Sequence, residues 1–170
     1  MLPHILLIGV FAGFLIVFWF TPVGVPTLKR LGGGQMPPDL RFTYGPELTY
    51  RLLNVYGARG VAHWRRMLFL DMIFPGVYAA LFALLATDWA NWVGAGPVWR
   101  WVAFSAPILA GASDYIENVL LFVVLNALPR QIPGVVRGAS FFTSVKFLFC
   151  YATLAIPLVH WVVVRMGWLG

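Results

Sequence analysis

The chain has 170 residues, of which 61% are hydrophobic and 11% charged, and its mean hydropathy is +0.82. This composition excludes an ordinary soluble domain of this length and predicts a protein of the lipid bilayer. The net charge of +6 would indicate nucleic-acid binding in a soluble protein, but most of the basic residues here fall between two apolar runs. We therefore expect membrane lipids, and no nucleic acid, as partners.

Four apolar runs are long enough to cross a bilayer, which requires about 20 helical residues. The predicted spans cover residues 2–21, 67–87, 98–128 and 141–164. The first run lacks the basic start and the small-residue cleavage site of a secretory signal, so we interpret it as a retained span. The chain, residues 1–170, is thus predicted to be one all-α integral membrane domain with four transmembrane helices in a compact bundle.

Residues 22–60, between the first two predicted spans, form the predicted cytoplasmic loop. Glycines and prolines punctuate the first half of this loop and predict irregular backbone there. Pro46 suits a first helical turn and Gly57 can end a helix, which predicts a short helix over residues 46–56. Its apolar side chains gather on one face, so we expect it to be an amphipathic helix in the membrane interface.

Basic residues and tryptophans predict the orientation. Translocated loops are depleted in Lys and Arg, whereas the segment between the first two spans holds Lys29, Arg30, Arg41, Arg51, Arg59, Arg65 and Arg66. We therefore expect this side to be cytoplasmic and both termini to be external.

Indole rings collect at membrane interfaces, and the predicted outer boundary holds Trp89, Trp92, Trp99, Trp101, Trp161 and Trp168. An aromatic belt accounts for them better than a stacking platform for sugar or nucleic acid.

Four ionisable side chains interrupt the predicted spans, namely Asp71, Asp114, Glu117 and Lys146. Each charge costs about 2.5–3.5 kcal/mol at the centre of a membrane helix, so these groups should face one another and not lipid. Counted from the cytoplasmic ends, Asp71, Glu117 and Lys146 fall in one band of the inner leaflet. The sequence therefore predicts a shared polar site between helices.

Helical spacing selects the residues of this site. Glu117 and Asn118 follow Asp114 by three and four positions and so share its helix face. In the second span, the face of Asp71 continues to Pro75, which frees a backbone carbonyl near Asp71. The predicted ligand-binding residues are Asp71, Tyr78, Asp114, Glu117, Asn118 and Lys146. The candidates for acid–base catalysis among them are Asp71, Asp114, Glu117 and Lys146.

Metal and cofactor motifs are weak in this chain. It has no H-E-x-x-H or Glu-x-x-His pair, and His4 and His160 should lie at the interface opposite to His63. The single Cys150 excludes an intrachain disulfide. We predict neither a metal nor a cofactor.

Several functions fit a buried site of this kind. The polar groups can form a packing network that holds the helices together, a pocket for an amphipathic lipid-like molecule, or a proton or solute pathway. The chain can also be an accessory subunit whose acids bind a membrane-protein partner. We predict small-molecule binding first among these, and the sequence leaves open whether the site also performs acid–base chemistry.

The spans also carry a resemblance to uncharacterised bacterial four-span membrane proteins. The residues that carry it are Asp71-Met72-Ile73-Phe74-Pro75 with Tyr78, Asp114-x-x-Glu117-Asn118, and Lys146. The resemblance covers spans two to four and implies a bacterial cytoplasmic membrane, but no activity. In architecture alone, a compact bundle with internal acids also resembles the emopamil-binding class of isomerases and sterol-binding proteins, from which no residue role carries over.

Overall fold

The computed structural model describes residues 2–166, and within them the chain folds into six α-helices and one short 3-10 helix without strands. Trp168, assigned above to the aromatic belt, lies outside the described residues. In chain order, the elements are α1 (Leu2–Phe20), α2 (Val25–Leu31), η1 (Pro38–Leu40), α3 (Pro46–Asp71), α4 (Phe74–Trp92), α5 (Pro97–Ala127) and α6 (Pro133–Arg165).

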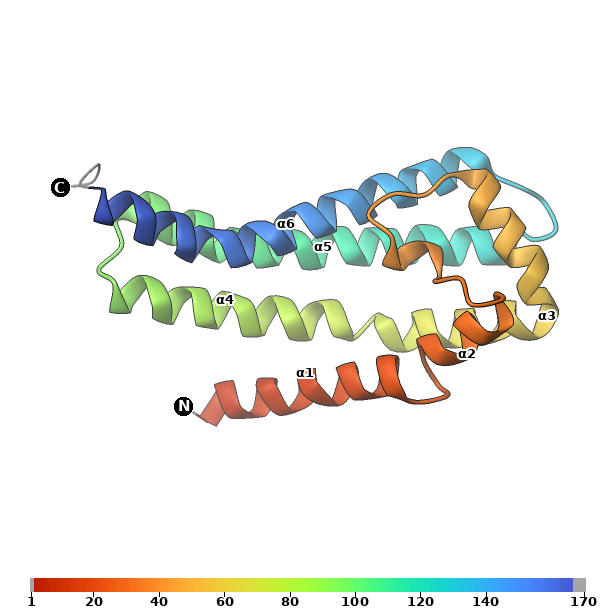
Figure 1. Cartoon of the computed structure of the whole chain (residues 1–170), viewed down its shortest axis with the longest axis horizontal. Coiled ribbons are helices and arrows are strands. Elements are labelled where there is room, and N and C mark those ends of the chain that lie inside the picture. Colours follow the sequence, from red (N-terminus) through yellow and green to blue (C-terminus); the bar gives the residue numbers. More distant parts are fainter. Residues whose placement is uncertain (1, 167–170) are drawn as a thin grey trace.

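The long helices α1, α4, α5 and α6 run along the length of the molecule (Figure 1). Helix α1 packs on α4, α4 on α5, and α5 on α6. Four helical stretches are long and apolar enough to cross a membrane, which confirms the predicted all-α class and its four span-length helices. The start of α1 and the end of α6 lie at one end of the bundle, here called the terminal end, whereas α2 and α3 lie at the other, here called the α3 end (Figure 1).

The second predicted span is broken in the structure. Helix α3 ends at Asp71, and α4 starts at Phe74 and continues to Trp92. Pro75 lies in the first turn of α4, where its missing N–H removes no helical hydrogen bond. The expectation that Asp71 and Pro75 lie in one continuous helix is therefore wrong. Asp71 instead occupies a helix end at the break.

The segment expected to be an aqueous loop is mostly helical. Helix α2 lies within it, and the helix that begins at Pro46 continues beyond residue 56 after a kink at Gly57. The φ angle of Gly57 is +58°, a conformation that other residues rarely adopt. Before the kink, Leu52 and Tyr56 are buried in the protein core. The apolar face of residues 46–56 thus contacts protein, whereas we expected it to contact the membrane interface.

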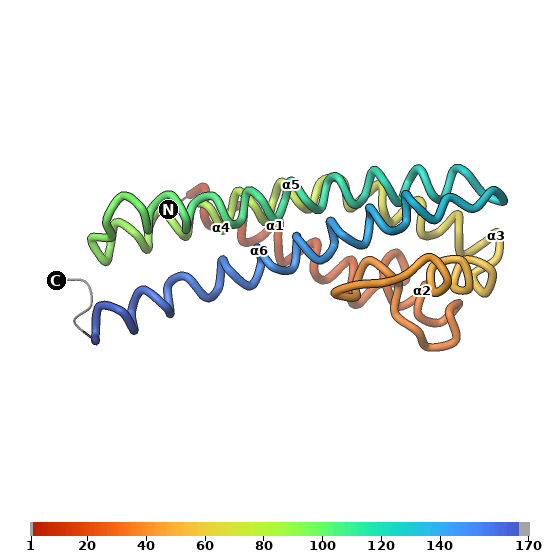
Figure 2. Tube along the Cα trace, turned by 90° about the horizontal axis from the view of Figure 1, so that it is seen from above, coloured from red at the N-terminus to blue at the C-terminus, as the bar shows by residue number. Residues whose placement is uncertain are grey.

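The third and fourth predicted spans differ from the structure in different ways. The prediction for residues 98–128 is within one residue of α5 at both ends. Helix α6 begins at Pro133, well before the predicted start at residue 141. Its first two turns pack at the α3 end, where Val136 and Ala139 are fully buried. These turns extend α6 along the full length of α5 (Figure 2).

Aromatic rings join the first helix to the bundle. Phe11 and Phe14 of α1 each stack or tilt against Phe74 with ring centroids 5.5 Å apart, and Phe18 approaches the same ring at 5.9 Å. Phe18 is the buried residue of α1, whose other side chains are mostly exposed. A cluster of large side chains fills the α3 end, including Leu28, Leu52, Trp64, Leu68, Leu121 and Leu125.

Candidate functional site

The buried face of α5 carries three neighbouring polar side chains in the half of the bundle nearer the α3 end. Asp114, Glu117 and Asn118 are 4%, 0% and 1% exposed. They share this face because residues three and four positions apart on a helix lie one above the other. The face is turned towards α4 and α6, between which α5 packs.

The ammonium of Lys146 on α6 bridges two of these acids. Its Nζ lies 3.1 Å from Oδ1 of Asp114 and 2.6 Å from Oε2 of Glu117. A charge placed so far from water is tolerated only when it is paired, and Lys146 gives both carboxylates the same partner. This contact fixes the position of α6 relative to α5.

Neutral donors complete the site. The hydroxyl of Tyr78 donates to Oδ2 of Asp114 at 3.1 Å, and Nδ2 of Asn118 donates to Oδ2 of Asp71 at 3.1 Å. The structure thus brings together all six predicted residues, which come from α4, α5, α6 and the end of α3. It adds Thr143 of α6, whose hydroxyl donates to Oε1 of Glu117 at 2.5 Å.

A fourth carboxylate, from Asp39 of η1, belongs to the same site and was missed by the sequence analysis. Asp39 is 6% exposed, and its Oδ1 has no hydrogen-bond partner among the described residues. Burial raises the pKa of this carboxyl from 3.8 to about 6, although the charge of Lys146 opposes the rise and that of Asp114 adds to it. The only sequence signal was an acid after two prolines, in a segment expected to be aqueous.

The segment that carries Asp39 is tied to α6. The backbone N–H of Tyr44 donates to Oγ of Ser140 at 2.9 Å, and Oγ of Ser144 donates to the carbonyl of Phe42 at 2.7 Å. The Tyr44 hydroxyl lies 3.4 Å from Oγ1 of Thr143. The chain between α2 and α3 therefore crosses to α6 and closes the site towards the α3 end (Figure 1).

The charges of the site do not balance. Four of the six acids in the chain, Asp39, Asp71, Asp114 and Glu117, gather around one ammonium group, that of Lys146. Burying three unbalanced negative charges is prohibitive, so part of this charge must be neutralised by protons or by a cation. The arrangement can therefore bind protons or a cationic group.

Two other basic residues near this level of the bundle, His63 and Arg66, have different surroundings. Nε2 of His63 lies 3.2 Å from the carbonyl of Gly24, and Arg66 is exposed. Within residues 2–166, no three His, Cys, Asp or Glu side chains are placed to share a metal ion. Neither His63 nor Arg66 therefore supplies the positive charge that the acids lack.

A small apolar cavity adjoins the polar cluster. Its volume is about 90 Å³, and α4, α5 and α6 line it with Tyr78, Phe82, Pro107, Ala110, Cys150, Thr153 and Leu154. Tyr78 connects the cavity to the cluster, because its hydroxyl binds Asp114. At the other side, Leu154 is 69% exposed, so the cavity reaches the apolar surface of the bundle.

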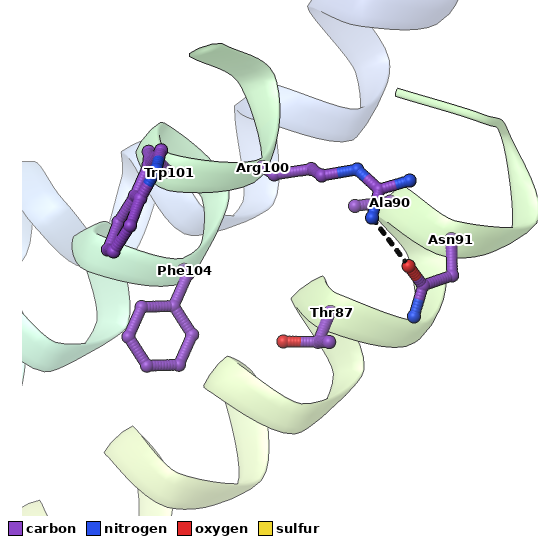
Figure 3. Close-up of a pocket in the computed structure, with 6 residues that line it drawn as sticks. All are labelled: Thr87, Ala90, Asn91, Arg100, Trp101 and Phe104. Atoms are coloured by element: carbon purple, nitrogen blue, oxygen red, sulfur yellow. Dashed lines mark hydrogen bonds between the residues drawn. The ribbon is translucent and has the colours of Figure 1, made fainter. Parts of the chain in front are cut away.

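A larger cavity, about 340 Å³, lies between α4 and α5 at the terminal end (Figure 3). Arg100, a charged residue that lines it, donates to Oδ1 of Asn91 at 2.9 Å and to the carbonyl of Ala95 at 2.7 Å. The guanidinium group is therefore held by the protein itself. This cavity contains none of the predicted site residues.

No protein-family model, curated protein or solved structure matches the chain. Its chemistry must therefore be inferred from the geometry of the site.

Proposed function

We propose that this chain is an integral membrane protein that binds an amphipathic, lipid-like molecule. The polar head of the ligand would meet the acidic cluster through Tyr78 and Asp114, and its first carbons would occupy the cavity between α4, α5 and α6. The observation that carries the proposal is this cavity, which ends on the Tyr78 and Asp114 pair and opens to the apolar surface at Leu154.

The outward surface supports a location within lipid. Large apolar side chains on α1 and α6 are strongly exposed, among them Leu6, Phe20, Leu154 and Leu158. A soluble protein seldom exposes so extensive an apolar surface, whereas a bilayer requires it. We assign the α3 end to the cytoplasm, because α2 and α3 carry most of the basic residues, and we assign both termini to the external side.

The charge of the cluster favours a cationic head group. Four carboxyl groups face one ammonium, so an amine would add the positive charge that the site lacks. Entry from lipid at Leu154 would bring such a head first to Tyr78 and then to Asp114. A carboxyl group that holds a proton could also exchange it with the bound head.

A transmembrane proton pathway has less support, because the hydrogen-bonded acidic cluster ends at Tyr78. Beyond it, towards the terminal end, the facing surfaces of α4 and α5 bury alanines, including Ala79, Ala83, Ala103 and Ala106. A pathway would need protonatable groups or water-binding groups along this half too. The other alternative is a purely structural network. It predicts the same hydrogen bonds as a ligand-binding site, so an experiment has to distinguish the two.

The test uses three probes with the same twelve-carbon chain, namely dodecylamine, dodecanol and dodecanoate, added to the full chain in lipid nanodiscs. We expect dodecylamine to raise the Tm most and dodecanoate least. Cys150→Phe would fill the cavity and should abolish the rise while leaving the protein folded. Leu148→Phe, which adds bulk at an exposed site on the same helix, should keep it.

Two results would reject the binding function. Equal effects of the three probes would show that they act only on the membrane. A response that survives Cys150→Phe would show that the cavity is not the binding site. If Asp114→Asn lowers the Tm and no probe acts on either the original chain or this variant, the cluster is a packing network.

A further inference from the structure

A second cavity, about 530 Å³, lies at the terminal end between the turn that joins α4 to α5 and the last turns of α6. Four indole rings, those of Trp89, Trp92, Trp99 and Trp161, line it together with His160 and Arg165. It is separate from the acidic cluster. Its volume is in the range of small-molecule sites, which is about 300–1,000 Å³.

His160 supplies a buried polar side chain that has no hydrogen-bond partner within residues 2–166. It is 7% exposed, and its ring meets Trp89 and Trp99 edge to face at centroid distances of 5.1 and 5.2 Å. An imidazole has two ring nitrogens, and His160 makes no hydrogen bond to any residue in the range 2–166. Because His160 lines the cavity, its ring nitrogens are available to a group that binds there.

Arg165 gives the cavity a positive charge. Its guanidinium lies over the ring of Trp161, 5.7 Å from the ring centroid, and none of the described residues that line the cavity carries a carboxylate. Asp88, which precedes Trp89, pairs with His4 at 2.7 Å. The cavity therefore favours an anion, in contrast to the acidic cluster.

Arg100, another arginine at the terminal end, makes different contacts from those of Arg165. Arg100 donates to Oδ1 of Asn91 (Figure 3) and also to the carbonyl of Ala95, so both of these donors bind oxygens of the protein. Arg165 makes no such hydrogen bond among the described residues, and its contact is the face of an indole ring. A planar guanidinium stacked on an aromatic ring keeps its N–H donors available for phosphate.

We propose that the cavity formed by the four tryptophans, His160 and Arg165 binds the phosphate of a phospholipid head group from the outer leaflet. Arg165 and His160 would contact phosphate oxygens, and the indole rings would surround the glycerol and the start of the acyl chains. Tryptophans favour this depth in a bilayer because their rings are apolar and their N–H groups are polar. The inference depends on the membrane location, but not on ligand binding at the acidic cluster.

Native mass spectrometry of the full chain, released from detergent micelles, tests the site. The ligands are phosphatidylglycerol, a diacylglycerol with the same acyl chains, and inorganic phosphate. We expect one tightly bound phosphatidylglycerol and no comparable binding of the other two. Because a charge-assisted hydrogen bond is lost, Arg165→Gln and His160→Phe should each weaken binding about tenfold. Arg100→Gln is the matched control and should change it less than about twofold.

Three outcomes would overturn the inference. Equal affinity for the diacylglycerol would show an apolar groove without phosphate recognition. Binding of inorganic phosphate with the same dependence on Arg165 would show a site for the free anion and not for lipid. An effect of Arg100→Gln as large as that of Arg165→Gln would show non-specific attraction to the interface. Arg165 is exposed at a helix end, so Arg165→Gln should fold normally. This variant therefore tests phosphate binding even if His160→Phe fails to fold.

Discussion

The two ends of the bundle hold the same helices together in different ways. Towards the α3 end, α5 and α6 meet through Glu117, Thr143 and Lys146, and large side chains fill the space around them. Towards the terminal end, the buried residues between helices are small, as with Ala103 and Ala106. In lipid there is little hydrophobic drive for helices to associate, so polar bonds and close contact of small residues are the two available solutions.

This difference in packing between the two ends indicates where a ligand can enter the bundle. The segment that carries Asp39 and Tyr44 covers the acidic cluster towards the α3 end, and the cavity of about 400 Å³ at that end is lined by Tyr50, Gly57 and Leu128 and by none of the cluster residues. The terminal half has its own cavities beside small residues. The small cavity at Tyr78 lies at the boundary between the two halves. A ligand bound in this cavity would contact the charged groups of the half nearer the α3 end. It would reach them through the less tightly packed terminal half. Four substitutions test this contrast.

Loss of Lys146 should have the largest effect. Lys146→Met leaves Asp114 and Glu117 buried without their cation, and breaking a buried ion pair in this way costs about 3–5 kcal/mol. We expect a strong loss of folded protein in a detergent unfolding titration. Adding Glu117→Gln to Lys146→Met should recover part of the loss, and the exposed Lys29→Met should have no effect. An unchanged unfolding free energy in Lys146→Met would show that the polar end does not depend on its ion pairs.

The change in the unfolding free energy with pH should depend on the protonation of Asp39. Its pKa in the folded chain is about 6, above the ordinary 3.8, so the folded state holds this proton more tightly than the unfolded state. Stability should therefore fall as the pH rises from about 4 to about 6. The rise of about 2 pKa units corresponds to about 3 kcal/mol.

Unfolding at pH 4.5 and pH 7.5 checks this expectation. Asp39→Asn should reduce the difference in stability between the two pH values, whereas Glu47→Gln, at the exposed start of α3, should leave it unchanged. An equal difference in the original chain and in Asp39→Asn would contradict the buried position of this carboxyl.

The close contact of α4 and α5 should respond to added volume at Gly111. A Cβ there would lie 2.9 Å from Cβ of Ala79 and 3.0 Å from the carbonyl oxygen of Pro75. Gly111→Ala should therefore destabilise the protein by about 1–3 kcal/mol, as overpacking does. In Gly138→Ala the nearest atom would be at an ordinary 3.6 Å, and the variant should be neutral or more stable. Equal stability of the two variants would mean that the helices do not approach as closely as described.

The ion pair at the terminal end should matter least. His4 and Asp88 join α1 to α4 at 2.7 Å, but the Asp88 side chain is 62% exposed. Asp88→Asn should change the unfolding free energy by less than about 0.5–1 kcal/mol, because exposed pairs contribute little. A loss as large as that of Lys146→Met would show that the two ends are held by equally strong ionic contacts.

Much of the acidic cluster could be predicted because its residues lie on regular helices. The spacing of Asp114, Glu117 and Asn118 places them on one face of any α-helix. Because an unpaired charge in an apolar environment is costly, Lys146 is expected to pair with these acids. Asp39 could not be predicted in this way. It reaches the cluster through an irregular segment, whose path depends on Ser140 and Ser144 of a helix about a hundred residues later.

The break between α3 and α4 gives a similar lesson. Pro75 is compatible with a kinked span or with the first turn of a new helix, and local preferences do not distinguish the two. In the structure, the break lets Asp71 reach Asn118, and Phe74 packs against three phenylalanines of α1. Contacts with other helices select the broken form.

Composition and helical periodicity alone determined the all-α class, the four span-length helices and the shared face of Asp114, Glu117 and Asn118, since these depend on apolar content and on local helix geometry. Tertiary structure decided which carboxylates share Lys146, where α3 ends, and that Asp39 and Tyr44 close the site. The physical reason is that hydrogen bonds and close packing between distant segments depend on how the helices meet in space.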